Sequence, residues 1–150
     1  MAKYADATNY GKSIDPSSAN IIDPGLLGGK VRVFQDTYTF GATSLNSQDY
    51  IVVGGKLPTG AQVVDIKLSM GSPAVSSNPT VVVGDEGTAN RYVTAIQVTG
   101  GYVLVGPTAV GGMYYSVTGT TDNYIRVAGG AAGSILSGAV VKISVMYVVE

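Results

Sequence analysis

The residues of this chain that could carry out chemistry are few. Histidine and cysteine are both absent from its 150 residues, and this removes the commonest general base, thiolate nucleophiles, disulfides and most zinc sites. Serine, threonine and tyrosine hydroxyls are plentiful, but a hydroxyl nucleophile needs a base beside it. Only a lysine or a carboxylate could fill that role here. We therefore expect a protein without enzyme activity.

Carboxylates are the remaining candidates for catalysis or metal binding. Asp85 and Glu86 are adjacent between two glycines, and we interpret them as a solvated turn, because a calcium site needs more oxygen ligands close by. The segment 121–123 (TDN) is typical of an Asx turn. A glycosidase needs two converging carboxylates, and nothing in the sequence brings together any two of the four remaining candidates: Asp36, Asp49, Asp65 and Asp122. We predict no metal site.

Two glycine-rich strings could be mistaken for phosphate-binding loops. They are residues 25–29 (GLLGG) and 129–133 (GGAAG). Both lack the lysine and the following helix that a phosphate cradle requires. We therefore expect neither a nucleotide nor any other cofactor.

The composition is unusually apolar for a chain of this length. Hydrophobic residues make up 45% and charged residues 13%, whereas charged residues are about a quarter of an ordinary soluble domain. A neutral, glycine- and threonine-rich surface would explain this. The alternative, which we favour, is that apolar surface faces partner subunits. We therefore expect a self-assembling protein, and specifically a homotrimer.

The charge balance argues against electrostatic partners. Nine basic and ten acidic residues give a net charge of −1, so no basic surface favours nucleic acid or an anionic membrane. The first residues lack the apolar core of a signal peptide, and no run of eighteen apolar residues occurs. We expect synthesis in the cytoplasm of the producing cell.

The clearest structural element is the segment 61–70 (AQVVDIKLSM). A turn at Pro58 and Gly60 precedes it. The alternation of apolar and polar residues predicts a half-buried strand. One face is expected to carry Val64, Ile66, Leu68 and Met70, and the opposite face Val63, Asp65, Lys67 and Ser69.

Similar apolar runs separated by turn residues predict an all-β domain over residues 30–150. A turn at Asp36 is expected to separate the first two runs. Gly84 and its neighbours indicate a hairpin, and the glycine doublets of the second half favour turns with positive φ. An antiparallel β-sandwich or jelly roll fits this spacing. The expected strands are 31–34, 38–40, 49–53, 61–70, 80–83, 91–98, 102–105, 113–118, 124–128 and 140–149.

The last expected strand, residues 140–149, is apolar on both faces. Such a pattern indicates a central strand or one that lies at a subunit interface. The face opposite the expected core supplies our candidates for that interface: Val140, Met146 and Val148.

Residues 1–29 show no regular hydrophobic period. Two similar tripeptides, Ile14-Asp15-Pro16 and Ile22-Asp23-Pro24, disfavour helix before each proline. We interpret this segment as an extended N-terminal arm that binds another surface, with a disordered tail as the alternative. The residues expected to make that contact are Tyr4, Tyr10, Ile14, Ile21, Ile22, Leu26 and Leu27.

Four phrases of the sequence resemble small structural proteins of tailed bacteriophages. They are 22–29 (IDPGLLGG), 55–61 (GKLPTGA), 82–85 (VVGD) followed by 90–92 (NRY), and the ending 145–150. The chain is most similar to capsid decoration, or cement, proteins. The resemblance implies a β-sandwich or jelly-roll trimer on the outer surface of the virion, made in the host cytoplasm, whose terminal arm contacts the major capsid protein. It implies no catalytic residues.

Two other functions remain compatible with the sequence. A fibre or tail-associated protein that recognises a host glycan would use a similar fold, as would a non-viral carbohydrate-binding module. Sugar rings stack on aromatic faces, so either function would need tyrosines on one exposed face. The candidates are Tyr102, Tyr114, Tyr115 and Tyr124.

Overall fold

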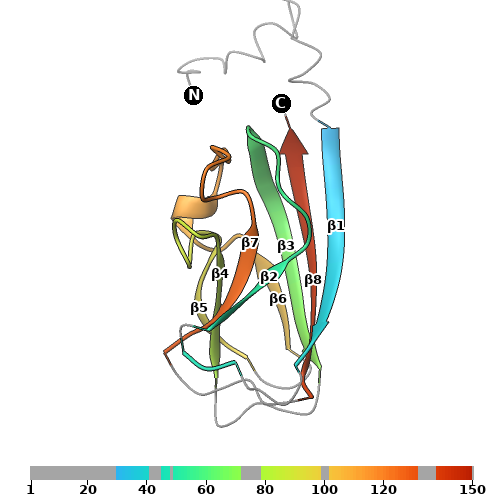
Figure 1. Ribbon diagram of the computed structural model, residues 1–150, viewed down its shortest axis with the longest axis vertical. Coiled ribbons are helices and arrows are strands. Elements are labelled where there is room, and N and C mark those ends of the chain that lie inside the picture. Colours follow the sequence, from blue (N-terminus) through green and yellow to red (C-terminus); the bar gives the residue numbers. More distant parts are fainter. Residues whose placement is uncertain are drawn as a thin grey trace, which may run out of the picture. The chain divides into compact units, whose positions relative to one another are not determined.

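A computed structural model of the chain describes residues 30–40, 45–47, 49–71, 79–98, 102–131 and 138–149, with backbone only for residues 30 and 102–105. Within these ranges the protein is almost entirely β-structure (Figure 1). The strands are β1 (Lys30–Thr39), β2 (Tyr50–Val53), β3 (Ala61–Gly71), β4 (Thr80–Gly84), β5 (Val93–Gln97), β6 (Tyr102–Gly106), β7 (Ile125–Gly129) and β8 (Val140–Val149). A short 3-10 helix, η1 (Val110–Gly112), follows β6. No helix of the described residues is long and apolar enough to cross a bilayer.

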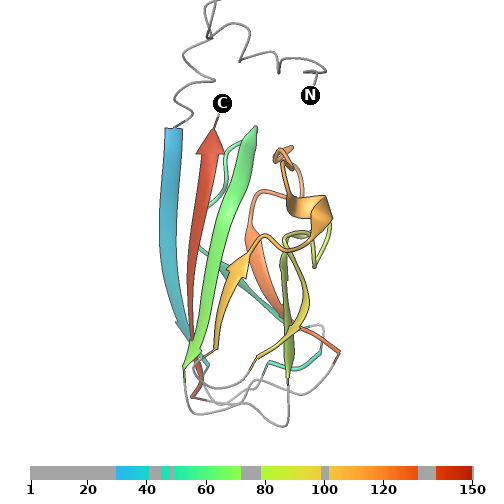
Figure 2. The same cartoon turned by 180° about the vertical axis from the view of Figure 1, so that it is seen from behind.

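The strands form two four-stranded sheets, ordered β1-β8-β3-β6 and β2-β7-β4-β5. The pairs β3–β6, β3–β8, β4–β5, β4–β7 and β2–β7 are antiparallel, and Figures 1 and 2 show β1 running opposite to β8. One hydrophobic cluster draws residues from both sheets: Ile66 and Ile143 belong to the first sheet, and Val83 and Val127 belong to the second. The predicted antiparallel sandwich is therefore confirmed, with the core between the sheets.

The two most periodic segments of the sequence occupy the centre of the first sheet. β3 starts after a turn in which Gly60 has φ +82° and the Ala61 N–H donates to the Pro58 carbonyl at 3.1 Å. β8 lies between β1 and β3. Its Val141 and Val145 side chains face the core. The interpretation of β8 as a central strand is confirmed, as is the β4–β5 hairpin.

Three local predictions are wrong. β1 continues through Asp36 without a turn, because the Asp36 carboxylate accepts N–H bonds from Thr37 and from Gly54, at 2.8 Å each, and so holds the strand in place. Residues 113–118 do not form a strand and belong to a loop. The doublets 111–112 and 129–130 have no positive φ. Gly129 and Gly130 instead allow close backbone approach, since a Cβ there would clash with Asn46 and Thr80.

Candidate interaction surfaces

The outer face of β1 and β8 carries exposed apolar side chains. Phe34 and Tyr147 pack against the core and face each other, with ring centroids 6.4 Å apart. Because side chains alternate along a strand, their neighbours point outward. Val31 and Val33 are 59% and 52% exposed, and the outward residues of β8 are half-buried. We call this group the outer strip: Val31, Val33, Met146 and Val148.

A β-bulge in β3 turns the side chain of Val64 outward. The β3–β8 pairing aligns Val63 with Tyr147 and Asp65 with Met146, so that Val64 is an extra residue. Val63 is consequently buried with Ile66 and its successors, whereas Val64 is exposed. The predicted alternation is wrong for Val63 and Val64, because a bulge exchanges the two faces of a strand at the inserted residue.

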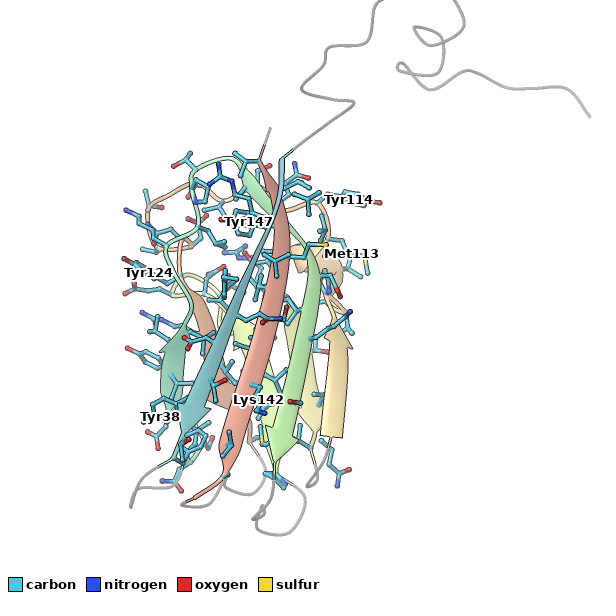
Figure 3. The ribbon with its side chains drawn as sticks, turned by 90° about the vertical axis from the view of Figure 1, so that its right-hand side faces the viewer. Tyr38, Met113, Tyr114, Tyr124, Lys142 and Tyr147 are labelled. Carbon is cyan, nitrogen blue, oxygen red and sulfur yellow. The ribbon has the colours of Figure 1, made fainter. Side chains whose placement is uncertain are left out.

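The loop that follows β6 presents a cluster of exposed apolar side chains. Val110 is 85% exposed and Tyr114 is 88% exposed, and Met113 is also exposed. Figure 3 shows Met113 and Tyr114 projecting beside the upper end of the first sheet, β1-β8-β3-β6. We call Val110, Met113 and Tyr114 the loop knob. Val64 and Pro107 line, with Met113 and Tyr114, a hollow of about 330 Å³ at its base.

Backbone contacts hold both ends of this loop. The Tyr92 carbonyl accepts N–H bonds from Thr108 at 2.9 Å and from Ala109 at 3.0 Å. A Cβ at Gly112 would clash with the Arg91 carbonyl oxygen and approach the Tyr92 Cα to 2.8 Å, so the loop lies directly on this backbone. At its far end, the Val117 N–H donates to the Ala61 carbonyl at 2.8 Å. The knob is therefore fixed to the sandwich.

Tyr114 adopts a backbone conformation that is unfavourable for its type. Its φ is +60°, in the left-handed region, and it is the one non-glycine residue with positive φ among those described. Such a conformation costs of order 1 kcal/mol or more and persists only when the surrounding structure imposes it. Strained residues of this kind concentrate at functional sites. An exposed tyrosine is also a common anchor in protein interfaces.

A buried ion pair lies beneath the knob. Asp85 is 1% exposed and forms an ion pair with the Arg91 Nε, while Arg91 Nη2 donates to its Oδ1 at 3.3 Å. The Thr88 N–H also donates to Oδ1, at 2.8 Å. Burial by itself lowers the pKa of Arg91, but the hydrogen bond to Asp85 and the negative charge of that carboxylate, with smaller contributions from Tyr115 and Tyr92, together outweigh burial and raise the pKa. The prediction that Asp85 is solvated is wrong, because the chain folds back after the turn and the Arg91 guanidinium pairs with the buried Asp85 carboxylate.

Asp122 continues this network on the other side of Arg91. The guanidinium carbon of Arg91 lies 3.8 Å from the centroid of the Tyr115 ring, and the Tyr115 hydroxyl donates to Asp122 Oδ2 at 2.5 Å. The N–H groups of Thr118 and Gly119 donate to Asp122 at 2.7 and 2.8 Å. Burial raises the pKa of Asp122, but these bonds together outweigh it and hold the pKa well below its usual range.

Asp122 thus differs from the predicted Asx turn, since its carboxylate binds backbone groups that precede it. Its contacts tie the end of the knob loop to the turn before β7. The chain of contacts from Asp85 through Arg91 and Tyr115 to Asp122 is structural, and it positions the residues on either side of the knob.

The outer face of the second sheet has a smaller exposed group. Tyr50 and Val52 lie on the edge strand β2, and Tyr124 precedes β7. The Arg126 guanidinium carbon is 4.2 Å from the Tyr50 ring centroid, and its Nη2 is 3.2 Å from Glu86 Oε2. This face is more polar than the loop knob, because the Arg126 guanidinium covers the Tyr50 ring.

The structure divides the predicted interface residues of β8. Met146 and Val148 lie on the outer strip near the end of the strand. Val140 pairs with Gly71 at the opposite end, so it is separated from the strip by the length of β8. The seven arm residues, from Tyr4 to Leu27, lie outside the described residues.

The tyrosines proposed for glycan binding do not share a face. Figure 3 shows Tyr114 and Tyr124 on opposite sides of the sandwich, and Tyr115 is half-buried against Arg91. The side chain of Tyr102 lies outside the described part of the chain. The three candidate tyrosines whose side chains the structure describes therefore do not form one common aromatic surface for a sugar.

The candidate carboxylates are also separated by their contacts. Asp49 accepts the Asn46 N–H at 3.0 Å, Asp65 lies 3.7 Å from the Lys67 ammonium, and Asp36 and Asp122 accept the backbone bonds given above. Within the described ranges, no three acidic side chains form a group that could hold a metal ion. These carboxylates have local structural roles.

Solved phage capsids contain chains with this architecture. A chain of the cyanophage Pam1 capsid asymmetric unit is similar over 81% of this chain and 86% of its own length, with 26% sequence identity and a TM-score of 0.64. A chain of the capsid of Ralstonia phage GP4 covers the same shares, with 20% identity and a TM-score of 0.60. No family model and no curated protein sequence matches this chain.

These similarities identify the class of protein. The GP4 comparison establishes the fold, and the Pam1 comparison adds sequence identity along most of the chain. The resemblance to phage virion proteins that the sequence motifs predict is confirmed at the level of a phage capsid-related protein.

Proposed function

We propose that the protein is a structural component of a phage virion that binds the outer surface of the capsid as a decoration protein and stabilises the shell. The observation that carries this proposal is the similarity to a chain of the Pam1 capsid across 81% of the sequence. We propose no catalytic role, since the carboxylates most suited to one are engaged in separate contacts.

The physical basis of such a function is repetition of a modest contact. A symmetric oligomer placed at the junction of several capsid subunits repeats each contact by symmetry, and linked contacts bind more tightly than single ones. Matched surface is sufficient for this task. The proposed assembly is a homotrimer, and its proposed partner is the major capsid protein.

In this proposal, residues 1–29 form the arm that contacts the capsid. Ordering an extended segment costs about 1 to 2 kcal/mol of backbone entropy per residue, while burying a leucine or isoleucine side chain returns only about 1.5 to 3 kcal/mol. One arm should therefore bind weakly. Several arms on one oligomer would bind more tightly, because each bound arm raises the effective concentration of the others.

The test is co-sedimentation with capsids that lack the protein. The full-length protein should sediment with them in saturable amounts, and a truncation that removes residues 1–27 should remain folded but stay in the supernatant. Retained binding by the truncated protein at full strength would move the contact to the β-domain. Failure of the full-length protein to bind any capsid preparation of its own phage would contradict the proposed function.

A further inference from the structure

We infer that β1 is a releasable strand, which opens from β8 as a unit while the rest of the sandwich stays folded. The inference goes beyond the proposed function, because it concerns the isolated chain and does not depend on capsid binding. It rests on the small part of β1 that is buried, on contacts that converge at Gly54, and on the firm attachment of the chain at Phe40.

β1 contributes no fully buried side chain to the core over residues 31–39, the part whose side chains the structure describes. Phe34 and Asp36 are half-buried, and the other side chains are exposed on both faces of the strand. In contrast, β3 buries residues such as Ile66 and Leu68 completely. Because burial of apolar surface is the main favourable contribution to folding, β1 is held to the sandwich much less strongly than β3.

β1 also lies at the edge of its sheet. Among the described strands it has β8 as its one neighbour, whereas β3 lies between β8 and β6. Figures 1 and 2 show β1 along the outer side of β8. Releasing an edge strand breaks a single ladder of hydrogen bonds, and water can replace the lost partners, so the net loss is modest. Local opening is expected where few apolar contacts hold an element.

Two contacts of β1 converge on Gly54, which follows β2 in the other sheet. The Gly54 N–H donates to the Asp36 carboxylate at 2.8 Å. The Phe34 ring lies against the Gly54 backbone, where a Cβ would clash with it. Only glycine suits this position well, because φ is also positive, at +69°. We call Phe34, Asp36 and Gly54 the β1 latch.

The chain that leaves β1 is firmly attached to the core at Phe40. The Phe40 side chain is buried. Its N–H donates to the Ala139 carbonyl at 2.9 Å, and its carbonyl accepts the Gly138 N–H at 2.7 Å. The Tyr38 ring packs edge-on against the Phe40 ring, with centroids 4.9 Å apart. Opening can therefore begin at Lys30 and ends before Phe40.

Release of β1 would lengthen the N-terminal segment. Residues 1–29 precede β1 directly in the sequence, so an opened β1 adds its 10 residues to them. An extended chain rises by about 3.3 Å per residue, which gives roughly 33 Å of additional reach. In the proposed function this length would let the arm span different distances on a capsid without unfolding the sandwich.

Native-state hydrogen exchange of the isolated full-length protein tests the inference. The slowest amides of β1 should exchange at least about 100-fold faster than the slowest amides of β3, because they need only local opening. Ile66→Val distinguishes local opening from global unfolding. Ile66 stays buried when β1 opens, so this variant should accelerate exchange in β3 by roughly 2- to 10-fold and leave exchange in β1 unchanged.

Two glycine variants test the latch. Gly54→Ala places a methyl group against the Phe34 ring, and opening of β1 relieves the clash, so exchange in β1 should rise by at least about tenfold. Gly60→Ala is the matched control: Gly60 also has a positive φ, +82°, but a Cβ there meets no atom within 4 Å. Its strain persists when β1 opens, so exchange should rise in β3 and stay unchanged in β1.

Three results would overturn the inference. They are β1 amides that exchange as slowly as those of β3, equal acceleration of both strands by Ile66→Val, and wild-type exchange of β1 in Gly54→Ala. Co-sedimentation tests the proposed function separately. Fast exchange of β1 in a protein that does not sediment with capsids contradicts only capsid binding, and slow exchange of β1 in a protein that does sediment contradicts only the release of β1.

Discussion

Replacing Arg91 with methionine should strongly destabilise the sandwich. Asp85 is 1% exposed, and the Arg91 side chain is 16% exposed. Methionine keeps much of the apolar stem but leaves the Asp85 carboxylate buried without its cation. Removing one partner of a buried ion pair costs about 3 to 5 kcal/mol.

The loss of the contact with Tyr115 adds to this effect. The guanidinium carbon lies 3.8 Å from the ring centroid, and such a cation–π contact contributes about 0.5 to 1 kcal/mol when partly exposed. The expected total is therefore about 4 to 6 kcal/mol. For a chain of this size, each kcal/mol lowers Tm by about 2 to 4 °C, so Tm should fall by roughly 10 to 20 °C.

Urea unfolding followed by circular dichroism measures this difference. All proteins should be compared at one concentration, because assembly itself adds to apparent stability. Lys67→Met is the matched control: Lys67 forms an exposed pair with Asp65 at 3.7 Å, and such pairs contribute about 0 to 1 kcal/mol. If Arg91→Met were within about 1 kcal/mol of the Lys67→Met control, the structural role assigned to the buried pair would be refuted.

Three further predictions concern the same region. Because the pKa of Asp122 is lowered in the folded protein, its contribution to stability is complete above the unfolded value of about 3.9 and is lost as pH falls below it; urea midpoints of the wild type should drop between about pH 5 and pH 2 more steeply than those of Asp122→Asn. Gly112→Ala should lower Tm and alter the knob, because its Cβ would clash with the Arg91 carbonyl; an unchanged Tm would show that the loop base can move. Tyr114→Gly should leave the stability of the folded chain unchanged or raise it by up to about 1 kcal/mol, since glycine adopts φ +60° without strain; a clear loss of stability in urea would argue against strain at this residue.

The central strands β3 and β8 could be predicted from sequence, because buried and exposed residues alternate along them with the two-residue period of a β-strand. β3 and β8 alternate over most of their length, and each pattern can be recognised without knowing which strand lies beside it. The bulge at Val64 could not be predicted in this way. It depends on how β3 aligns with Tyr147 and Met146 of β8, and neither segment alone specifies the register between them.

The misinterpretation of Asp85 has a similar cause. An acidic pair between glycines is locally a solvated turn, and the ion pair forms only because the turn returns Arg91 to the carboxylate. A useful signal was present, since a single arginine follows Asp85 by six residues within an otherwise uncharged hairpin arm. The contribution of Tyr115 and Asp122 could not be found, because they come from a segment more than twenty residues further along the chain.

The loop knob was missed for a different reason. Residues 113–118 are rich in β-forming types, and propensity alone favours a strand. The start of this loop instead packs on the backbone of Arg91 and Tyr92, to which Thr108 and Ala109 donate hydrogen bonds and against which Gly112 lies. These tertiary contacts override the local preference for a strand. Exposure of Val110 and Tyr114 follows from that docking and has no local signature.

The central claim, that this protein decorates a phage capsid, is tested most directly by counting it in purified virions. Quantitative mass spectrometry should give its copy number relative to the major capsid protein of the same particles. We predict a number comparable to that of the capsid subunits, in a fixed ratio set by the symmetry of the shell. A handful of copies per particle would indicate a tail or fibre component, and absence from the particle would contradict a virion role altogether.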